Sequence, residues 1–270
     1  MNAMSPPRPI HQRSRGSAAV ALGPAGRLQR LAQSGAARAL VLPAGGGPEV
    51  VFLNTSGGLT SGDRLDYALD LAGGRATGTT QTAERAYRAG AGPARVRVRL
   101  RVGAGGHLDW LPQETILFQS SRLQRRTVID LAADATCLAL ESVVLGRAAM
   151  GERVTCTSLD DHRLIRRAGR PVALEPLRLR GPALDAPAVL GVARAFASLT
   201  LVAQGAEDAL APVRAVLTEP GVEGGASGWD GRLSVRLLAR DGWPLRRQIL
   251  RLLAVLRPAP LPRVWQGGAP

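Results

Sequence analysis

Three acidic residues lie where a carboxylate can do more than face water. Glu141 is at the centre of the apolar run 137–145, Glu175 precedes a proline in a second apolar stretch, and Asp63 closes the glycine-rich segment 54–63. An ionised carboxylate in apolar surroundings is costly unless it meets a cation, a hydrogen-bond donor or water. The chemistry open to these groups is therefore ion pairing with arginine or contact with a passing metal ion.

The sequence leaves two interpretations open for these acids. If 137–145 is a strand, Cys137 and Val143 share the face of Glu141, and its partner is either an arginine or a polar passage for a metal ion. Asp63 either shapes an Asx-type turn or, because the glycines around it allow close approach, meets a small ion.

No residue pattern indicates catalysis. The three histidines have no metal-ligand spacing, and none of the serines near glycines forms the Gly-x-Ser-x-Gly elbow of a hydrolase. The segment 57–62 is neither a dinucleotide fingerprint nor a phosphate-binding loop, and the absence of lysine excludes Schiff-base chemistry. We therefore predict a protein that is not an enzyme and holds no tightly bound cofactor; a hydrolase or transferase with an unfamiliar site ranks last.

All 35 basic residues are arginines, and the formal net charge is +14. Such a surface favours acidic partners. Single-stranded nucleic acid is bound by basic strands with interleaved aromatic residues, but the arginine-rich stretch 94–102 has no aromatic residue. A basic, β-rich nucleic-acid-binding protein is thus the alternative, and a protein partner or a solvated face is favoured.

The hydrophobic pattern predicts a mostly β protein with a few helices, mainly in the C-terminal third. Residues 1–16 form an expected flexible lead, and 17–270 a single β-rich domain. Arginine alternates with Val or Leu over 94–102, which indicates a strand with one wet and one buried face. Further strands are expected at 49–53, 115–119, 127–131, 135–145, 177–180 and 232–238, with another opening at Leu108, and helices at 188–202, 206–217 and 244–256. Pro244 suits the first turn of the last helix, and Pro258 ends it.

The location expected from the sequence is a reducing cytoplasm. The two cysteines, Cys137 and Cys156, form no disulfide framework. The N-terminal apolar stretch 18–22 is too short for a signal peptide, and the longest apolar segment, 186–203, is interrupted by Arg194, so no membrane association is expected.

Five segments together resemble the urease accessory protein UreD family, also called UreH. They occur in family order and span nearly the whole chain: Leu53-Asn54-Thr55-Ser56-Gly57-Gly58-Leu59-Thr60-Ser61-Gly62-Asp63, Thr79 to Arg88, Leu108 to Ile116, Leu140 to Glu152, and the closing Leu261-Pro262-Arg263-Val264-Trp265. Glu84, within the second segment, departs from the family pattern and is given no role.

The resemblance implies a β-helix-like fold and a non-enzymatic chaperone role in urease maturation. Its implied partners are UreF, UreG through UreF, and apo-urease, with no nucleic acid. Ni²⁺ is implied as transient cargo that passes through the protein, and Asp63, Glu141 and Glu175 match the acidic positions along that path. Nickel binds imidazole and thiolate tightly and isolated carboxylates loosely, which suits a path that must release its cargo.

Overall fold

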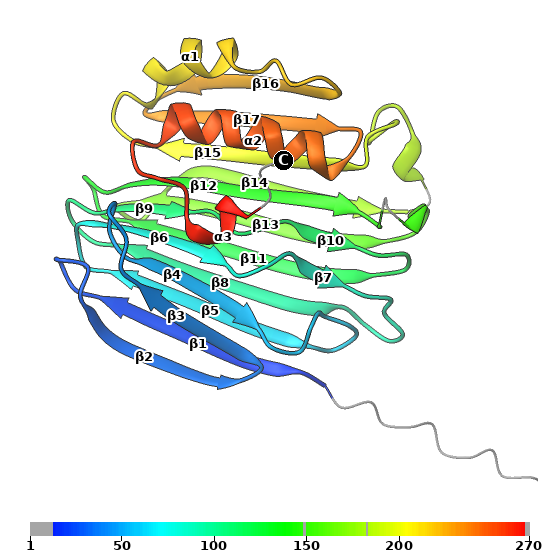
Figure 1. Ribbon diagram of the computed structural model, residues 1–270, viewed down its shortest axis with the longest axis horizontal. Coiled ribbons are helices and arrows are strands. Elements are labelled where there is room, and N and C mark those ends of the chain that lie inside the picture. The colour runs from blue at the N-terminus through cyan, green and yellow to red at the C-terminus, as the bar shows by residue number, and fades with distance from the viewer. Residues whose placement is uncertain (1–12, 148–149, 182, 268–270) are drawn as a thin grey trace, which may run out of the picture.

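The computed structural model describes residues 13–147, 150–181 and 183–267, which form two stacked β-sheets (Figure 1). Within these residues the first sheet has seven strands in the order β14-β13-β11-β8-β5-β1-β2. Their bounds are β1 Arg15–Leu22, β2 Leu28–Gly35, β5 Arg64–Leu71, β8 Ala94–Val102, β11 Arg122–Leu131, β13 Ser158–Arg167 and β14 Arg170–Arg180. Residues 1–12 of the expected lead lie outside the described residues, and β1 begins at Arg15.

The second sheet runs in the order β16-β17-β15-β12-β9-β6-β4-β3, and two short strands, β10 and β7, continue beside β12. The bounds are β3 Ala37–Leu42, β4 Glu49–Asn54, β6 Arg75–Thr80, β7 Glu84–Ala86, β9 His107–Trp110, β10 Thr115–Leu117, β12 Thr136–Leu145, β15 Ala195–Val202, β16 Val222–Trp229 and β17 Arg232–Ala239. All the strands expected from the sequence are present, with β10 shorter and β11 and β14 longer than predicted.

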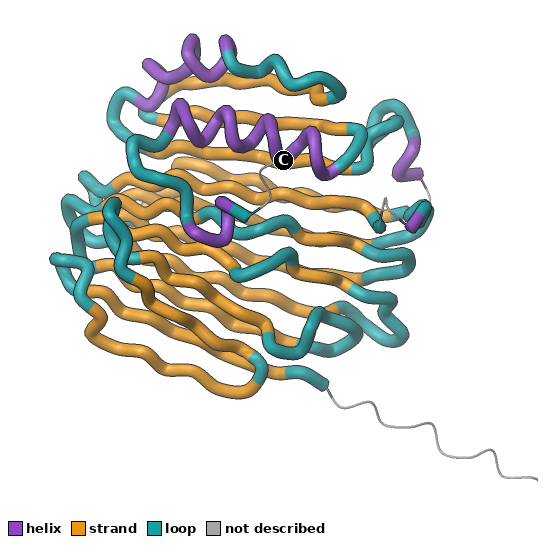
Figure 2. The backbone as a smooth tube through the Cα atoms, in the orientation of Figure 1, coloured by secondary structure: helices purple, strands orange, loops and turns teal. Residues whose placement is uncertain are grey.

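The chain passes back and forth between the sheets from β4 to β13, and neighbouring strands in the middle of each sheet are parallel. This path is that of a flattened β-helix (Figure 2). Antiparallel strands close both ends, β1–β2 and β3–β4 at one and β13–β14 and β15–β17–β16 at the other. The predicted mostly β, β-helix-like fold is confirmed.

The space between the sheets is filled by the apolar phase of each strand. In β8, Val98 and Leu100 are buried in this core, while Arg97, Arg99 and Arg101 point outward and are exposed. The alternation of arginine and aliphatic residues therefore gave both the strand and its orientation, because successive side chains of a strand lie on opposite faces.

Helices cover the outer face of the second sheet near the C-terminus (Figure 1). Helix α2, Gly242–Leu256, starts after Asp241, whose carboxylate accepts a hydrogen bond from the Gly242 N–H at 2.6 Å. Its buried face forms a second core with β12, β15 and β17. This confirms the predicted helix, which begins two residues earlier than expected.

The other predicted helices need correction. Residues 195–202 of the expected helix 188–202 form strand β15, which is buried on both faces, between α2 and the inter-sheet core. A strand buried on both faces lacks charged residues and a regular polar–apolar alternation, so its sequence resembles that of a buried helix. The expected helix 206–217 is a 3₁₀ turn, Ala206–Ala209, followed by the short α1, Leu210–Ala215; a 3₁₀ turn at Ala183–Asp185 and α3, Arg263–Gln266, complete the helical segments of the described chain.

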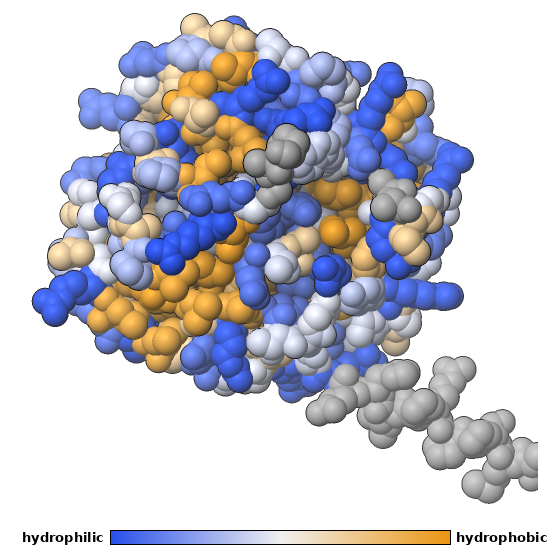
Figure 3. Space-filling model, viewed as in Figure 1, coloured by the Kyte–Doolittle hydropathy of each residue, from blue (hydrophilic) through white to orange (hydrophobic). Residues whose placement is uncertain are grey.

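The surface carries exposed apolar side chains among arginines. Figure 3 shows apolar surface in the region of α2 and of the outer strands β3 and β4, broken by hydrophilic groups. Leu40 and Trp243 contribute to the exposed apolar residues. In the part of the chain that the structure describes, every helix is too short or too polar to cross a membrane.

Candidate functional site

Six charged side chains form a connected cluster that starts between the two sheets and ends at the exposed Arg236, and we call it the interior charge cluster: Arg125, Glu141, Asp161, Arg163, Glu175 and Arg236. Strand pairing places them side by side. Arg125 is opposite Asp161 in the β11–β13 pair, and Arg163 is opposite Glu175 in the β13–β14 pair. In the second sheet, Ser198 of β15 lies between Glu141 of β12 and Arg236 of β17.

Arg125 is the centre of the buried part of the cluster. Its Nε and Nη2 donate to the two oxygens of Asp161 at 3.1 and 2.7 Å, and its Nη1 donates to the Thr115 hydroxyl at 2.9 Å. Arg125 is 8% exposed and Asp161 1% exposed. This two-pronged contact is the geometry in which a guanidinium holds a carboxylate most strongly.

Glu141 lies on the apolar face of β12, as its position in the sequence predicted. Its Oε1 accepts from the Trp110 indole N–H at 3.2 Å, and its Oε2 is 2.7 Å from Arg125 Nη1. That short contact is an ion pair whose N–H does not point at the oxygen. Oε2 is therefore a buried oxygen that accepts no hydrogen bond. Glu141 is therefore held less completely than Asp161.

The two carboxylates beside Arg125 differ in acidity. Burial opposes ionisation of both, yet the charge and hydrogen bonds of Arg125 leave the pKa of Asp161 below its ordinary value. For Glu141 burial prevails over the charge of Arg125, and the pKa lies above its ordinary value. Arg125 thus stabilises the ionised form of Asp161 more than that of Glu141.

Glu175 lies at the outer end of the cluster. Its Oε2 is 3.1 Å from Arg163 Nη1 and accepts a hydrogen bond from Ser198 at 2.9 Å. Its Oε1 is 3.8 Å from the exposed Arg236. Arg163 also hydrogen-bonds the Ser198 hydroxyl. Glu175 is therefore held by two arginines and a serine from three neighbouring strands.

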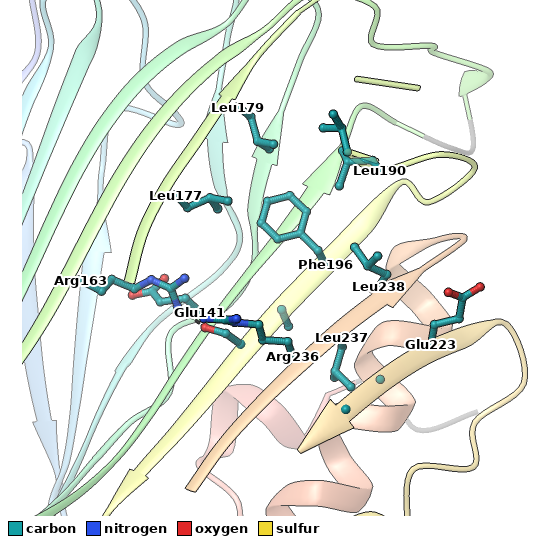
Figure 4. Close-up of a pocket in the computed structure, with 15 residues that line it drawn as sticks. Glu141, Arg163, Leu177, Leu179, Leu190, Phe196, Glu223, Arg236, Leu237 and Leu238 are labelled. Carbon is teal, nitrogen blue, oxygen red and sulfur yellow. Dashed lines mark hydrogen bonds between the residues drawn. The ribbon is translucent and has the colours of Figure 1, made fainter. Parts of the chain in front are cut away.

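A cavity of about 540 Å³ opens beside the cluster. Figure 4 shows Glu141, Arg163 and Arg236 grouped at one end of it, while mainly apolar side chains line the rest, among them Leu177, Leu179, Leu190, Phe196, Leu237 and Leu238. Glu141 and Arg163 also line a second cavity of about 20 Å³, together with Glu175. The two acids that the sequence singled out on strands are therefore brought to the same interior space.

Asp63 has a different setting. Its Oδ1 accepts from the Ser14 N–H and its Oδ2 from the Thr60 N–H, both at 2.8 Å, in the loop before β5. The carboxylate is buried and fixes the glycine-rich loop, but not as the Asx-type turn that was predicted, because its backbone donors are three residues earlier and in the N-terminal segment rather than two residues later. Its contacts do not include the interior charge cluster.

Sequence reasoning missed Arg125, Asp161 and Glu84. The signal for the first two was the strand phase: Arg125 lies on the same face as Leu123 and Ile129, and Asp161 on the same face as Leu159, so both fall on buried faces. Glu84 has no such signal, because β7 is only three residues long.

Glu84 faces the interior from β7. Its carboxylate accepts from the Asn54 amide at 3.0 and 3.3 Å and, with Tyr67, lines a small cavity of about 50 Å³. Burial raises the pKa of Glu84 to about 7, although the Asn54 hydrogen bond and the charge of Arg125 act in the opposite direction.

The cluster is not a preformed metal site. Across the described residues, no three His, Cys, Asp or Glu side chains converge to hold a metal ion. Each acid of the cluster instead meets at least one arginine, and three arginines balance three acids. Any cation that contacts Glu141 or Glu175 must therefore compete with a guanidinium.

Comparisons with known proteins converge on one family. The family model described as "UreD urease accessory protein" matches residues 14–266. A protein of Cereibacter sphaeroides named urease accessory protein UreD is 61% identical, over 98% of this chain and all of the relative. Proteins of the same name from Paracoccus denitrificans and Rhizobium leguminosarum bv. trifolii are 59% and 47% identical, over 94% and 88% of this chain and 93% and 89% of theirs. These matches give no support to the nucleic-acid alternative.

Proposed function

Because the chain belongs to the UreD urease accessory protein family, we propose that it is a non-catalytic maturation factor that conducts Ni²⁺ to apo-urease. In this proposal it assembles with UreF, through UreF with UreG, and with the urease subunits in the cytoplasm. Nickel is cargo and is not retained. The family membership supports the maturation role, and the interior of the protein supports the passage of a cation.

The observation that carries the nickel proposal is a buried row of carboxylates beside a large cavity. Glu141 and Glu175 share an interior space with arginines and hydroxyl groups, and the cluster contains neither histidine nor cysteine. Oxygen ligands hold Ni²⁺ more weakly than imidazole or thiolate does. Such a row suits an ion that is passed on.

The arginines set the condition for passage. With all six groups ionised the cluster has no net charge, because Arg125, Arg163 and Arg236 balance its three acids. A dication gains a carboxylate only where an arginine contact gives way. Glu141 meets this condition best, because its Oε2 touches Arg125 without hydrogen-bond alignment and has no other donor, whereas Oε2 of Glu175 also accepts from the Ser198 hydroxyl.

Asp63 keeps a predicted place on the path, with a structural task as well. Its two backbone hydrogen bonds fix the loop before β5. Loss of its charge is therefore expected to disturb this loop whether or not nickel passes, so Asp63 is a poor residue for testing conduction.

The experiment that tests the proposal is Glu141→Gln in cells that express urease with all its accessory proteins. We expect urease activation to fall strongly, because the amide keeps the shape of the side chain and removes its charge, while co-purification with UreF and apo-urease is unchanged. Glu219→Gln is the matched control, since Glu219 is also an acid clamped by two arginines, Arg247 and Arg251 of α2, but lies outside the cluster. Full activation by Glu141→Gln would remove Glu141 from the path.

A further inference from the structure

Arg125 donates its hydrogen bonds to two residues that are not candidate nickel contacts. Asp161 takes Nε and Nη2, and the Thr115 hydroxyl takes Nη1. The guanidinium is thereby fixed in direction by acceptors from two different strands, β13 and β10.

Glu141 lies within reach of the same guanidinium but receives none of its aligned hydrogen bonds. The distance from Arg125 Nη1 to Glu141 Oε2 is 2.7 Å, equal to the distance from Nη2 to Asp161 Oδ2. The difference is direction, because Oε2 accepts no hydrogen bond although the residue is only 5% exposed. Glu141 also lines the cavity of about 540 Å³.

We propose that Asp161 and Thr115 act as positioning residues that hold the Arg125 guanidinium in one orientation. In this orientation Arg125 donates no aligned hydrogen bond to Glu141, which can therefore exchange its arginine contact for a passing dication. The inference rests on the proposed nickel function and assigns the control of Glu141 to residues that touch no cargo. Arg125 neutralises the buried acids at rest and gives up only its misaligned contact when cargo arrives.

The physical basis is the directionality of the guanidinium. Its planar set of donors matches one carboxylate in a two-pronged contact, and such charge-assisted pairs are about twice as strong as neutral hydrogen bonds. If Asp161 loses its charge, the free face of Arg125 can turn to Glu141 and form that contact there. Glu141 would then be locked, and a dication would have to break two aligned hydrogen bonds.

Glu175 gives an internal comparison. Its carboxylate already accepts from Ser198 and pairs with Arg163 and Arg236. Its arginine contacts are also ion pairs without hydrogen bonds, but Oε2 has a hydroxyl donor and the charge is shared by two arginines, so no single partner controls it. Control through one oriented arginine is therefore specific to Glu141.

The test compares three variants of the full chain, expressed with urease and the other accessory proteins. Asp161→Asn is expected to lower urease activation about tenfold, the effect of one or two added charge-assisted hydrogen bonds on Glu141. Thr115→Val, which frees only Nη1, should lower it by a smaller factor of about two to three. The double variant Arg125→Met/Asp161→Asn removes the arginine that locks Glu141 and should restore activation to within about threefold of the wild type.

The recovery in the double variant is the readout that a merely structural role of Asp161 would not produce. Equilibrium dialysis of each purified variant against nickel chloride gives a second readout: Asp161→Asn should bind no more Ni²⁺ than the wild type, and the double variant should bind more. Melting temperatures and co-purification with UreF show that each variant is folded and assembled. If Asp161→Asn does not fold, Thr115→Val decides the outcome, because it is close to isosteric.

The outcomes separate this inference from the proposed function. If Glu141→Gln abolishes activation while Asp161→Asn and Thr115→Val leave it unchanged, the inference that Asp161 and Thr115 position Arg125 for nickel transfer is wrong, and the proposed nickel path stands. The inference is also wrong if the double variant is as inactive as Asp161→Asn. If Glu141→Gln activates urease fully, the proposed path itself fails.

Discussion

The two ends of the space between the sheets are built on different principles. Towards β1, β5 and β8 the interior is apolar, and Val20, Leu69 and Leu100 are almost fully buried. Towards β11, β13 and β14 the inward phase still carries apolar residues such as Leu159, but it also carries Arg125, Asp161 and two further members of the interior charge cluster, and the remaining two reach them from β12 and β17. We call these the apolar half and the charged half of the interior.

The difference teaches how each half is stabilised and what it can do. A buried aliphatic side chain stabilises the protein by itself, in proportion to the area removed from water. A buried charge stabilises nothing alone, because its desolvation must be offset by a partner. The apolar half therefore supports the fold, whereas the charged half can exchange partners and is the half suited to transfer.

The largest effect is expected from Arg125→Met in the charged half. The variant leaves Asp161 and Glu141 buried without their main cation, which should cost about 3–5 kcal/mol of unfolding free energy. Urea unfolding measures it. The double variant Arg125→Met/Asp161→Asn should lose clearly less than the single variant, because both members of the pair are gone. Equal losses in the two variants would contradict the view that pairing, rather than side-chain packing, stabilises this half.

The apolar half is expected to respond in the opposite way to a double change. Leu100→Ala should cost about 3 kcal/mol through lost burial and the cavity left behind. Leu69 lies opposite Leu100 in the β5–β8 pair, and Leu69→Ala/Leu100→Ala should cost more than either single variant. Urea unfolding of all three variants checks this. A double variant more stable than Leu100→Ala would remove the distinction between the halves.

Much of this comparison could be predicted from the sequence. The alternation in 94–102 gave a strand and the face it buries, and the apolar run around Glu141 gave a buried acid. The sequence also allowed the buried faces of Arg125 and Asp161 to be predicted from the strand phase. The role of a buried arginine, however, cannot be predicted until its partner is known. That partner comes from the register of β11 on β13, residues 36 positions apart, which no local pattern specifies.

Two other features were beyond local reasoning for physical reasons. Residues 195–202 are buried on both faces, which removes the polar–apolar alternation that distinguishes a strand from a helix. Glu84 becomes special only because β7 carries it beside Asn54 and Tyr67, which come from other strands. In both cases tertiary contacts, and not the neighbours in the chain, decide the environment.

Glu84 lies where the two halves meet, and it allows their boundary to be tested by pH. Its carboxyl lines a cavity with Tyr67 of the apolar half and is influenced by the charge of Arg125. Because burial raises its pKa from 4.5 to about 7, the native state binds this proton more tightly than the unfolded state. Below about pH 4.5 Glu84 therefore does not destabilise the protein, and its unfavourable contribution grows between pH 4.5 and about 7 and is constant at higher pH.

The smallest predicted effect is that Glu84→Gln stabilises the protein at neutral and alkaline pH and hardly at all near pH 5. The amide resembles the protonated acid and keeps an acceptor for Asn54, so the variant should gain on the order of 2 kcal/mol at pH 8.5 and little at pH 5. Unfolding free energies measured over this pH range test it, with the same substitution at the exposed Glu223 as the control. No gain at pH 8.5, or a loss there, would show that the charge of Glu84 is already compensated, in which case Arg125 pairs with Glu84 as well and the charged half extends to β7.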